Sequence, residues 1–258
     1  MTLKCLEPAA VDVQAVRSIN VARRGRYAGS VGDGIEQQQQ GSVTTATERF
    51  ERAAERVFGG WALIIGGVLL FGAQFLIALL PAPPAAPSGL TRWVHGYAFA
   101  LSMSDELLFF AIVCLTPGVV VLFRTTRFRR PVSSLLGCSS LLLAMTLLGV
   151  LVVVVGRLVY PVFGISLSDD AIALVVSMFF GGLHSVLLFI GVGLIATGFA
   201  LRQENAGRRL PIASFGAAAL QVLGAFPWLT PAWVNVTTAA ALFAWMLAAG
   251  RWLRSARS

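Results

Sequence analysis

A histidine, a glutamine and two acids stand inside long apolar segments, where polar side chains that can move protons or bind solutes are rare. His184 lies about 14 residues after Asp170 and 18 before Arg202, so a helix rising ~1.5 Å per residue places it near the middle of a bilayer. An ionisable group at that depth is a candidate ligand or proton site. The alternative is a neutral histidine bonded to a neighbouring Ser, Gln or backbone carbonyl.

Gln221 lies near the middle of another apolar segment, on one helical face with Ala213, Ala217 and Ala225. A stripe of small residues favours close packing against a second helix, and such packing could bring Gln221 within reach of His184. Two hypotheses remain open for this amide. It makes a hydrogen bond between helices, or it contacts a solute.

The role of Asp105 and Glu106 depends on where their helix begins. If it begins near Phe99, the two carboxylates lie at the outer end, where the helix dipole favours negative charge. If it begins farther upstream, they lie deeper and form a cation or proton site next to His95 or Arg157.

No enzyme signature accompanies these residues. HExxH, GxSxG, P-loop and dinucleotide-binding motifs are all missing from the sequence. The two histidines, His95 and His184, lie at different predicted depths, which disfavours a bis-histidine haem, and no spacing of Asp, Glu and His supports a metal site. Cys5, Cys114 and Cys138 form no paired motif. We therefore name no catalytic residue and expect no metal and no cofactor, and a membrane enzyme ranks third among the function classes, because no convergent catalytic set can be named.

The elements that hold these residues are predicted to be transmembrane helices. With 57% hydrophobic and 12% charged residues, the chain is too apolar for a soluble domain. Backbone groups in lipid must be paired internally, and ~20 apolar helical residues cross the hydrocarbon core. We predict an all-α, polytopic transmembrane helix bundle with six spans. The spans are approximately residues 58–80, 97–123, 132–155, 171–200, 211–228 and 232–250.

The chain divides into a polar tail, residues 1–56, and a transmembrane domain, residues 57–258. Residues 1–43 lack a sustained apolar period and are predicted to be disordered. Thr45 and Glu48 fit a capping box, which predicts a short juxtamembrane helix up to Val57. The first apolar run is too long for a signal-peptide core, so we expect it to be retained as an anchor.

Basic residues indicate the orientation of the bundle. If there are six spans, eighteen of the twenty Lys and Arg residues lie on one side, and only Arg92 and Arg157 lie on the other. The basic side is therefore predicted to be cytoplasmic, with both termini, in the cell (plasma or inner) membrane. The expected partners are the lipid bilayer and, at the Arg clusters, anionic headgroups. Nucleic acid is not expected, because the Arg residues stand at the ends of apolar runs. The small-residue faces leave a homo-oligomer open.

The second half of the chain carries several recognisable features. They are Gly182-Leu183-His184, Arg209-Leu210-Pro211, Phe215-Gly216, the proline-rich turn at 227–231 and Trp245. With these features, about the last ninety residues resemble a family of uncharacterised bacterial six-helix integral membrane proteins, a domain of unknown function. The resemblance implies a six-helix fold and no particular activity.

Two hypotheses for function follow from the sequence. In the first, the protein transports or senses a small solute or proton through a polar path lined by His184, Gln221, Asp105 and Glu106. In the second, it is a non-catalytic structural or accessory membrane protein, for which the helix bundle alone is sufficient.

Overall fold

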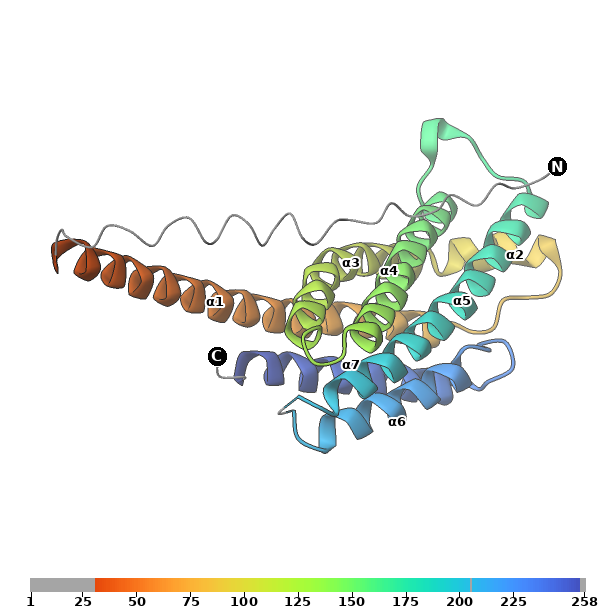
Figure 1. The fold of residues 1–258 in the computed structure, drawn as a ribbon. Helices are drawn as coiled ribbons and strands as arrows, with labels where there is room; N and C mark the ends of the chain where they lie inside the picture. Colours follow the sequence, from red (N-terminus) through yellow and green to blue (C-terminus); the bar gives the residue numbers. More distant parts are fainter. Residues whose placement is uncertain (1–30, 205, 256–258) are drawn as a thin grey trace, which may run out of the picture. The chain divides into compact units, whose positions relative to one another are not determined.

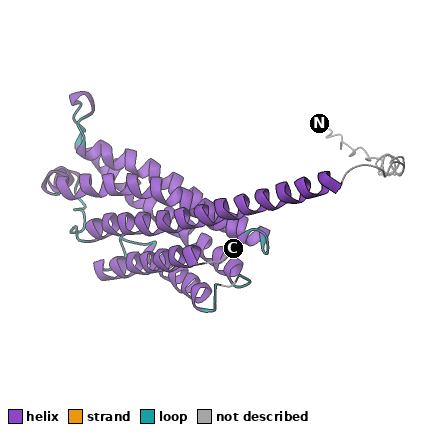
Figure 2. Cartoon of the chain, turned by 90° about the vertical axis from the view of Figure 1, so that its left-hand side faces the viewer, coloured by secondary structure: helices purple, strands orange, loops and turns teal. Residues whose placement is uncertain are grey.

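The computed structural model describes the backbone of residues 31–204 and 206–255, and the side chains from Phe50 onward. This part of the chain contains helices, turns and loops and no strand (Figure 2). The helices are α1 (Val31–Ala78), α2 (Pro87–Gly96), α3 (Ala98–Thr126), α4 (Pro131–Val159), the 3-10 turn η1 (Val162–Gly164), α5 (Asp169–Leu201), α6 (Arg209–Gly224) and α7 (Ala232–Ser255).

The prediction of an all-α bundle is confirmed, but the number of spans is not six. Within the described part, five helices are long and apolar enough to cross a membrane, which is the architecture of a multi-pass membrane protein. They are residues 50–78 of α1 and the whole of α3, α4, α5 and α7. Helix α6 has 16 residues, or about 24 Å of helix, which is shorter than the ~30 Å hydrocarbon core. The predicted span 211–228 was too long because the helix ends at Gly224 and the last four residues belong to the turn.

The tail also differs from its prediction. Residues 1–30 lie outside the described residues, but residues 31–43, predicted to be disordered, belong to α1. The predicted juxtamembrane helix is likewise continuous with the first span. Once a helix is nucleated, each further residue adds a hydrogen bond, so a stable span extends readily into a polar flank that contains no proline. The chain divides into two units, residues 1–47 and 48–258, and the bundle belongs to the second.

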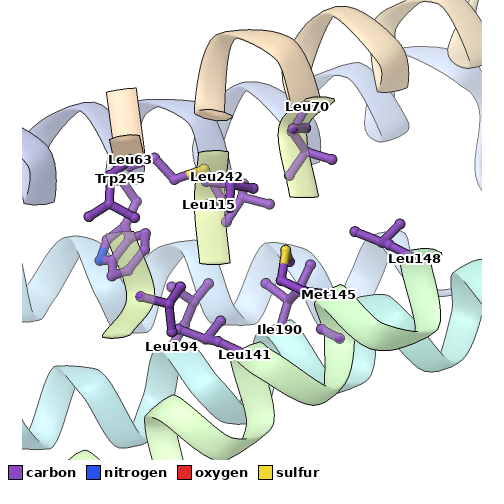
Figure 3. Packing of buried hydrophobic residues seen from close by; sticks show 14 of the residues in the cluster. Leu63, Leu70, Leu115, Leu141, Met145, Leu148, Ile190, Leu194, Leu242 and Trp245 are labelled. Atoms are coloured by element: carbon purple, nitrogen blue, oxygen red, sulfur yellow. The ribbon is translucent and has the colours of Figure 1, made fainter. Parts of the chain in front are cut away.

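The helices of the bundle approach one another at glycines. A Cβ atom at Gly250 of α7 would lie 2.6 Å from Gly60 O of α1, and one at Gly118 of α3 would lie 2.8 Å from Leu63 Cγ of α1. Helix α4 packs between α3 and α5, and α6 packs between α5 and α7 (Figure 1). Buried side chains from α1, α3 and α7 face those from α4 and α5 (Figure 3). They include Leu63, Leu70, Leu115, Leu242, Trp245, Leu141, Met145, Ile190 and Leu194.

Basic residues gather at one end of the bundle, where α5 ends and α6 begins. We call this the Arg-rich end, defined by Arg124, Arg129, Arg202 and Arg254. Arg124 Nη1 lies 2.6 Å from Glu55 Oε1, and Arg129 Nη1 donates a 2.6 Å hydrogen bond to the carbonyl of Gln203. The guanidinium groups of Arg202 and Arg254 lie over the rings of Phe215 and Trp61, respectively. These contacts connect α1 to α3 and to α7, and the end of α5 to α6, at the same end of the bundle.

The opposite end is closed by α2, a helix that lies outside the six predicted spans. Pro87 begins it, where the missing proline N–H costs no helical hydrogen bond. Its buried residues Leu90, Trp93 and Val94 pack against α5. The spacing of these residues, with polar Thr91 and Arg92 between Leu90 and Trp93, is the amphipathic pattern of this element.

Candidate functional site

His184 lies in the middle of α5 and bonds to a backbone carbonyl at the end of α6. Its Nδ1 lies 2.7 Å from the carbonyl oxygen of Ala225, which can only accept, so Nδ1 carries the proton and donates. Its ring is also flanked by Phe226, 4.8 Å away between centroids, and Trp228, 5.7 Å away. Ala225 is the C-cap residue of α6, at the end of the helix where backbone carbonyls lack helical partners. His184 therefore caps α6 and fixes the α6–α7 turn against α5.

Gln221 joins α6 to α7 and does not contact His184 within the described structure. It is fully buried, and its Nε2 donates a 3.0 Å hydrogen bond to the carbonyl of Thr238. Thr238 Oγ1 donates in return to the carbonyl of Leu220 at 3.2 Å. Gln221 Oε1 has no hydrogen-bond partner among the described atoms. Of the two hypotheses, the geometry favours a hydrogen bond between helices.

Asp105 and Glu106 lie in α3 near the C-terminal end of α4. Helix α3 begins at Ala98, so neither acid is in its first turn, where the dipole would favour it most. Asp105 is 5% exposed, and its Oδ2 faces Gly156 of α4, while its Oδ1 has no partner in the described structure. Glu106 Oε1 accepts a 2.9 Å hydrogen bond from the hydroxyl of Tyr160.

If Asp105 and Glu106 formed a cation or proton site, His95 or Arg157 was predicted to be their neighbour. Arg157 instead donates a 2.9 Å hydrogen bond from Nη2 to the carbonyl of Ile165. The partner that the structure adds is Tyr160, which lies just beyond the end of α4. The hydrogen bond to Glu106, and then desolvation and the negative charges of Glu106 and Asp105, raise the pKa of the Tyr160 phenol.

The four candidate residues do not converge on one cavity. His184 and Gln221 lie at the α6–α7 turn but bond to different carbonyls, and the two acids lie between α3 and α4. Among the described residues, no group of three or more His, Cys, Asp or Glu side chains could hold a metal ion.

The structure contains a large cavity that the sequence did not predict. Along α5, Gly198 packs against Ser214, Gly191 against Ala218, and His184 bonds to Ala225, so the α6–α7 hairpin turns back at the middle of α5. The remaining residues 169–183 extend about 22 Å beyond this turn. Between them and the end of α1 lies a cavity of about 670 Å³.

The loop between α1 and α2, residues 79–86, which we call the Pro-rich loop, borders the other side of this cavity together with α2. Pro81, Pro83 and Pro84 line it, together with Trp93 of α2. The Trp93 Nε1–H donates a 3.0 Å hydrogen bond to the carbonyl of Pro81, which fixes the loop to α2. At the start of α5, Ser168 accepts a 3.3 Å hydrogen bond from the Ala171 amide and caps the helix. Asp169 accepts a hydrogen bond from Thr91, which joins α5 to α2.

The cavity lining is apolar except for a few neutral groups. Among the described residues, no Lys, Arg, His, Asp or Glu side chain lines it. Its polar side chains are Gln74, Ser177, Thr230, Asn235 and Thr238. Gln74 is not among the residues predicted from the sequence. It is the one amide in the apolar run 58–80, and that isolation was the available signal. None of the four residues proposed from the sequence lines the cavity.

Comparison with protein-family models, curated proteins and solved structures finds no match to this chain. The resemblance to a six-helix bacterial family therefore stays a prediction.

Proposed function

We propose that this protein is a non-catalytic membrane protein that binds a small uncharged solute in the cavity between α1 and α5, in a sensing role. The observation that carries the proposal is the cavity itself. Its volume of about 670 Å³ falls within the ~300–1,000 Å³ typical of ligand sites, and its lining combines apolar surface with few polar groups.

The alternative of a polar transport path has less support. His184 and Gln221 each use a side-chain nitrogen to bond a backbone carbonyl at a helix junction. A proton or ion carrier at these positions would have to break contacts that hold α6 in place. Asp105 and Glu106 lie apart from them, between α3 and α4. A purely structural role remains the second candidate, and it predicts that the cavity holds nothing but bulk lipid.

We also propose that the bundle lies in the cell membrane with its Arg-rich end on the cytoplasmic side. The hairpin brings the end of α5, the start of α6 and the end of α7 to one side, so the clustered Arg residues there satisfy the positive-inside rule despite five full spans. Arg130, Arg208 and Arg251 are suited to anionic headgroups at that side.

Photolabelling in lipid nanodiscs tests the cavity. The probe is a phenyl diazirine that carries no hydrogen-bonding group, and mass spectrometry maps its adducts on the full chain. We expect labelling of the cavity face of α5, around Ser177 and Leu183, above the level on residues that face lipid.

Two neighbouring substitutions separate the cavity from the lipid surface. Ser177→Phe places a ring in the cavity and should abolish the labelling of its lining. Met178→Phe is the matched control, because Met178 is 51% exposed and does not line the cavity. Labelling that is equal in the two variants, or that is missing from the cavity of the natural chain, would show that no solute site exists there.

A further inference from the structure

Two amide side chains in the cavity have hydrogen-bonding capacity that the described structure does not use. Gln74 of α1 makes no hydrogen bond within residues 50–204 and 206–255. Asn235 of α7 accepts a 3.0 Å hydrogen bond from Thr230 through Oδ1, and its Nδ2 has no partner among the described groups. Polar groups in apolar surroundings are costly unless they are paired. The other polar side chains of the lining bond to nearby backbone carbonyls or to Asn235.

A charged ligand would find no counter-charge in this cavity. No ionisable side chain from the described part of the chain lines it, and His184, the nearest one along α5, uses its proton to bond Ala225 at the α6–α7 turn. A carboxylate, phosphate or ammonium group would therefore lose its hydration without gaining an ion pair. A group with one hydroxyl or carbonyl loses far less and gains the hydrogen bonds that the amides offer.

We propose that the ligand is an uncharged, lipid-like molecule with a single hydroxyl or carbonyl group on an apolar chain, and that Gln74 determines this specificity. This inference rests on the proposed function and adds to it the chemical class of the solute. The apolar residues of α1, α5 and the Pro-rich loop bind the chain, for example Ile77, Val176 and Phe180. The Gln74 amide, which can both donate and accept, binds the polar group.

Bulk membrane lipid is the competing occupant. An acyl chain that enters from the side keeps its phosphate in the headgroup region, so it fills the apolar surface without using Gln74. Such an occupant shows no preference for a hydroxyl group. The two cases are therefore distinguished by selectivity and not by occupancy.

Competition against the diazirine label measures this selectivity. The competitors are dodecane, 1-dodecanol and dodecanoate at pH 8, each expressed as its mole fraction in the nanodisc lipid. We expect 1-dodecanol to displace the label at about tenfold lower mole fraction than dodecane, the ratio that one hydrogen bond provides. Dodecanoate should compete least, because the carboxylate has no counter-charge.

Substitution at Gln74 assigns the effect. Gln74→Leu should remove the advantage of 1-dodecanol over dodecane and leave dodecane itself unchanged. Gln74→Met provides a second, unbranched replacement if the first lowers expression. Gln221→Leu is the matched control, since it also removes an amide from a helix but lies outside the cavity, and it should preserve the tenfold ratio.

The outcomes separate this inference from the proposed function. If the cavity is labelled but dodecane and 1-dodecanol compete equally, or if Gln74→Leu keeps the ratio, the inference is wrong and the solute site stands. If dodecanoate competes best, the ligand is charged and the inference is also wrong. If the cavity is not labelled at all, the proposed function fails first.

Discussion

The two halves of the bundle along its axis are packed in opposite ways. Towards the Arg-rich end, helices touch at their backbones, as at Gly60 and Gly250, where an added Cβ would lie 2.6 Å from a carbonyl oxygen. In the other half, the α6–α7 hairpin has turned back, and α5 and the end of α1 border a cavity of about 670 Å³. There, a Cβ added at Gly181 would meet no described atom within 4 Å, while at the adjacent Gly182 α5 still packs closely against Leu151 of α4.

We infer from this difference that the two halves have different roles in the bundle. Inside a bilayer, helices gain little from burying apolar surface, so their association depends on close van der Waals packing and on hydrogen bonds between helices. The half with glycine contacts supplies that association. The other half can then keep an open space, because its helices are already held together elsewhere. Substitutions that test this view should have large effects in the first half and small ones in the second.

Gly250→Val should have the largest effect. Its Cβ would meet Gly60 O at 2.6 Å and Ile64 Cγ1 at 2.7 Å, and a backbone oxygen cannot move aside as a side chain can. We expect α1 and α7 to be forced apart, with a loss of about 3 kcal/mol of stability. Thermal unfolding of the full chain in detergent measures it.

The control is a glycine that touches nothing. Gly216→Val introduces the same side chain into α6 at an exposed position with no described atom within 4 Å. It should leave the unfolding temperature nearly unchanged. An equal loss in the two variants would mean that helix propensity, and not the backbone contact, governs stability.

Ser214→Ala tests the hydrogen bonds of the packed half. The Trp245 indole N–H donates a 2.7 Å hydrogen bond to Ser214 Oγ, and Ser214 is fully buried between α6 and α7. Removing the hydroxyl leaves a buried N–H without its partner, so we expect a loss of about 1–2 kcal/mol. Thr237→Ala, an exposed position whose hydroxyl bonds only its own helix, is the control and should change stability by less than about 0.5 kcal/mol. Equal losses would argue against a role for the Trp245 contact.

The helical architecture was predictable because it follows from the pairing of backbone groups in lipid, which a run of apolar residues reveals directly. The length of α6 was not. Its apolar run continues through Ala225 and Phe226, but the helix ends at Gly224, where His184 bonds to the Ala225 carbonyl. Hydropathy registers how apolar a residue is, and it does not register where a helix ends.

The candidate site was predicted less well, for a related reason. His184 and Asp105 were predicted because ionisable side chains are rare in apolar segments. A cavity, in contrast, depends on how far each helix extends beside its neighbours. The end of α6 beside the middle of α5 borders the cavity, and hydropathy alone does not mark that end. Gln74 was not among the predicted site residues, although it is an amide in an apolar segment like Gln221.

His184→Leu probes the boundary between the two halves. Leucine keeps the apolar contact with Phe226 but cannot donate to the Ala225 carbonyl, 2.7 Å away in the natural chain. We expect a loss of about 1 kcal/mol in unfolding experiments and no change in cavity photolabelling, because His184 does not line the cavity. Lost labelling with unchanged stability would instead assign His184 to the solute site.

The smallest effect is expected at the exposed contact between Tyr160 and Glu106. The hydrogen bond from the phenol to the carboxylate raises the pKa of Tyr160 in the folded protein. A raised pKa favours the protonated phenol, so this contribution to stability is present below the ordinary tyrosine pKa of about 10 and is lost as the pH rises through the folded value. Because Tyr160 is 40% exposed, solvent screens the interaction and the effect on unfolding should be slight.

Absorbance titration of tyrosinate makes this contact measurable. Tyr160→Phe identifies the Tyr160 signal by difference, and Glu106→Gln should move its midpoint to lower pH, because the neutral amide no longer opposes the phenolate charge. Tyr97→Phe leaves that signal in place and serves as the control. An unchanged midpoint in Glu106→Gln would mean that the α3–α4 contact is not populated in the membrane. The open half of the bundle would then lack the hydrogen bond that joins the end of α4 to α3.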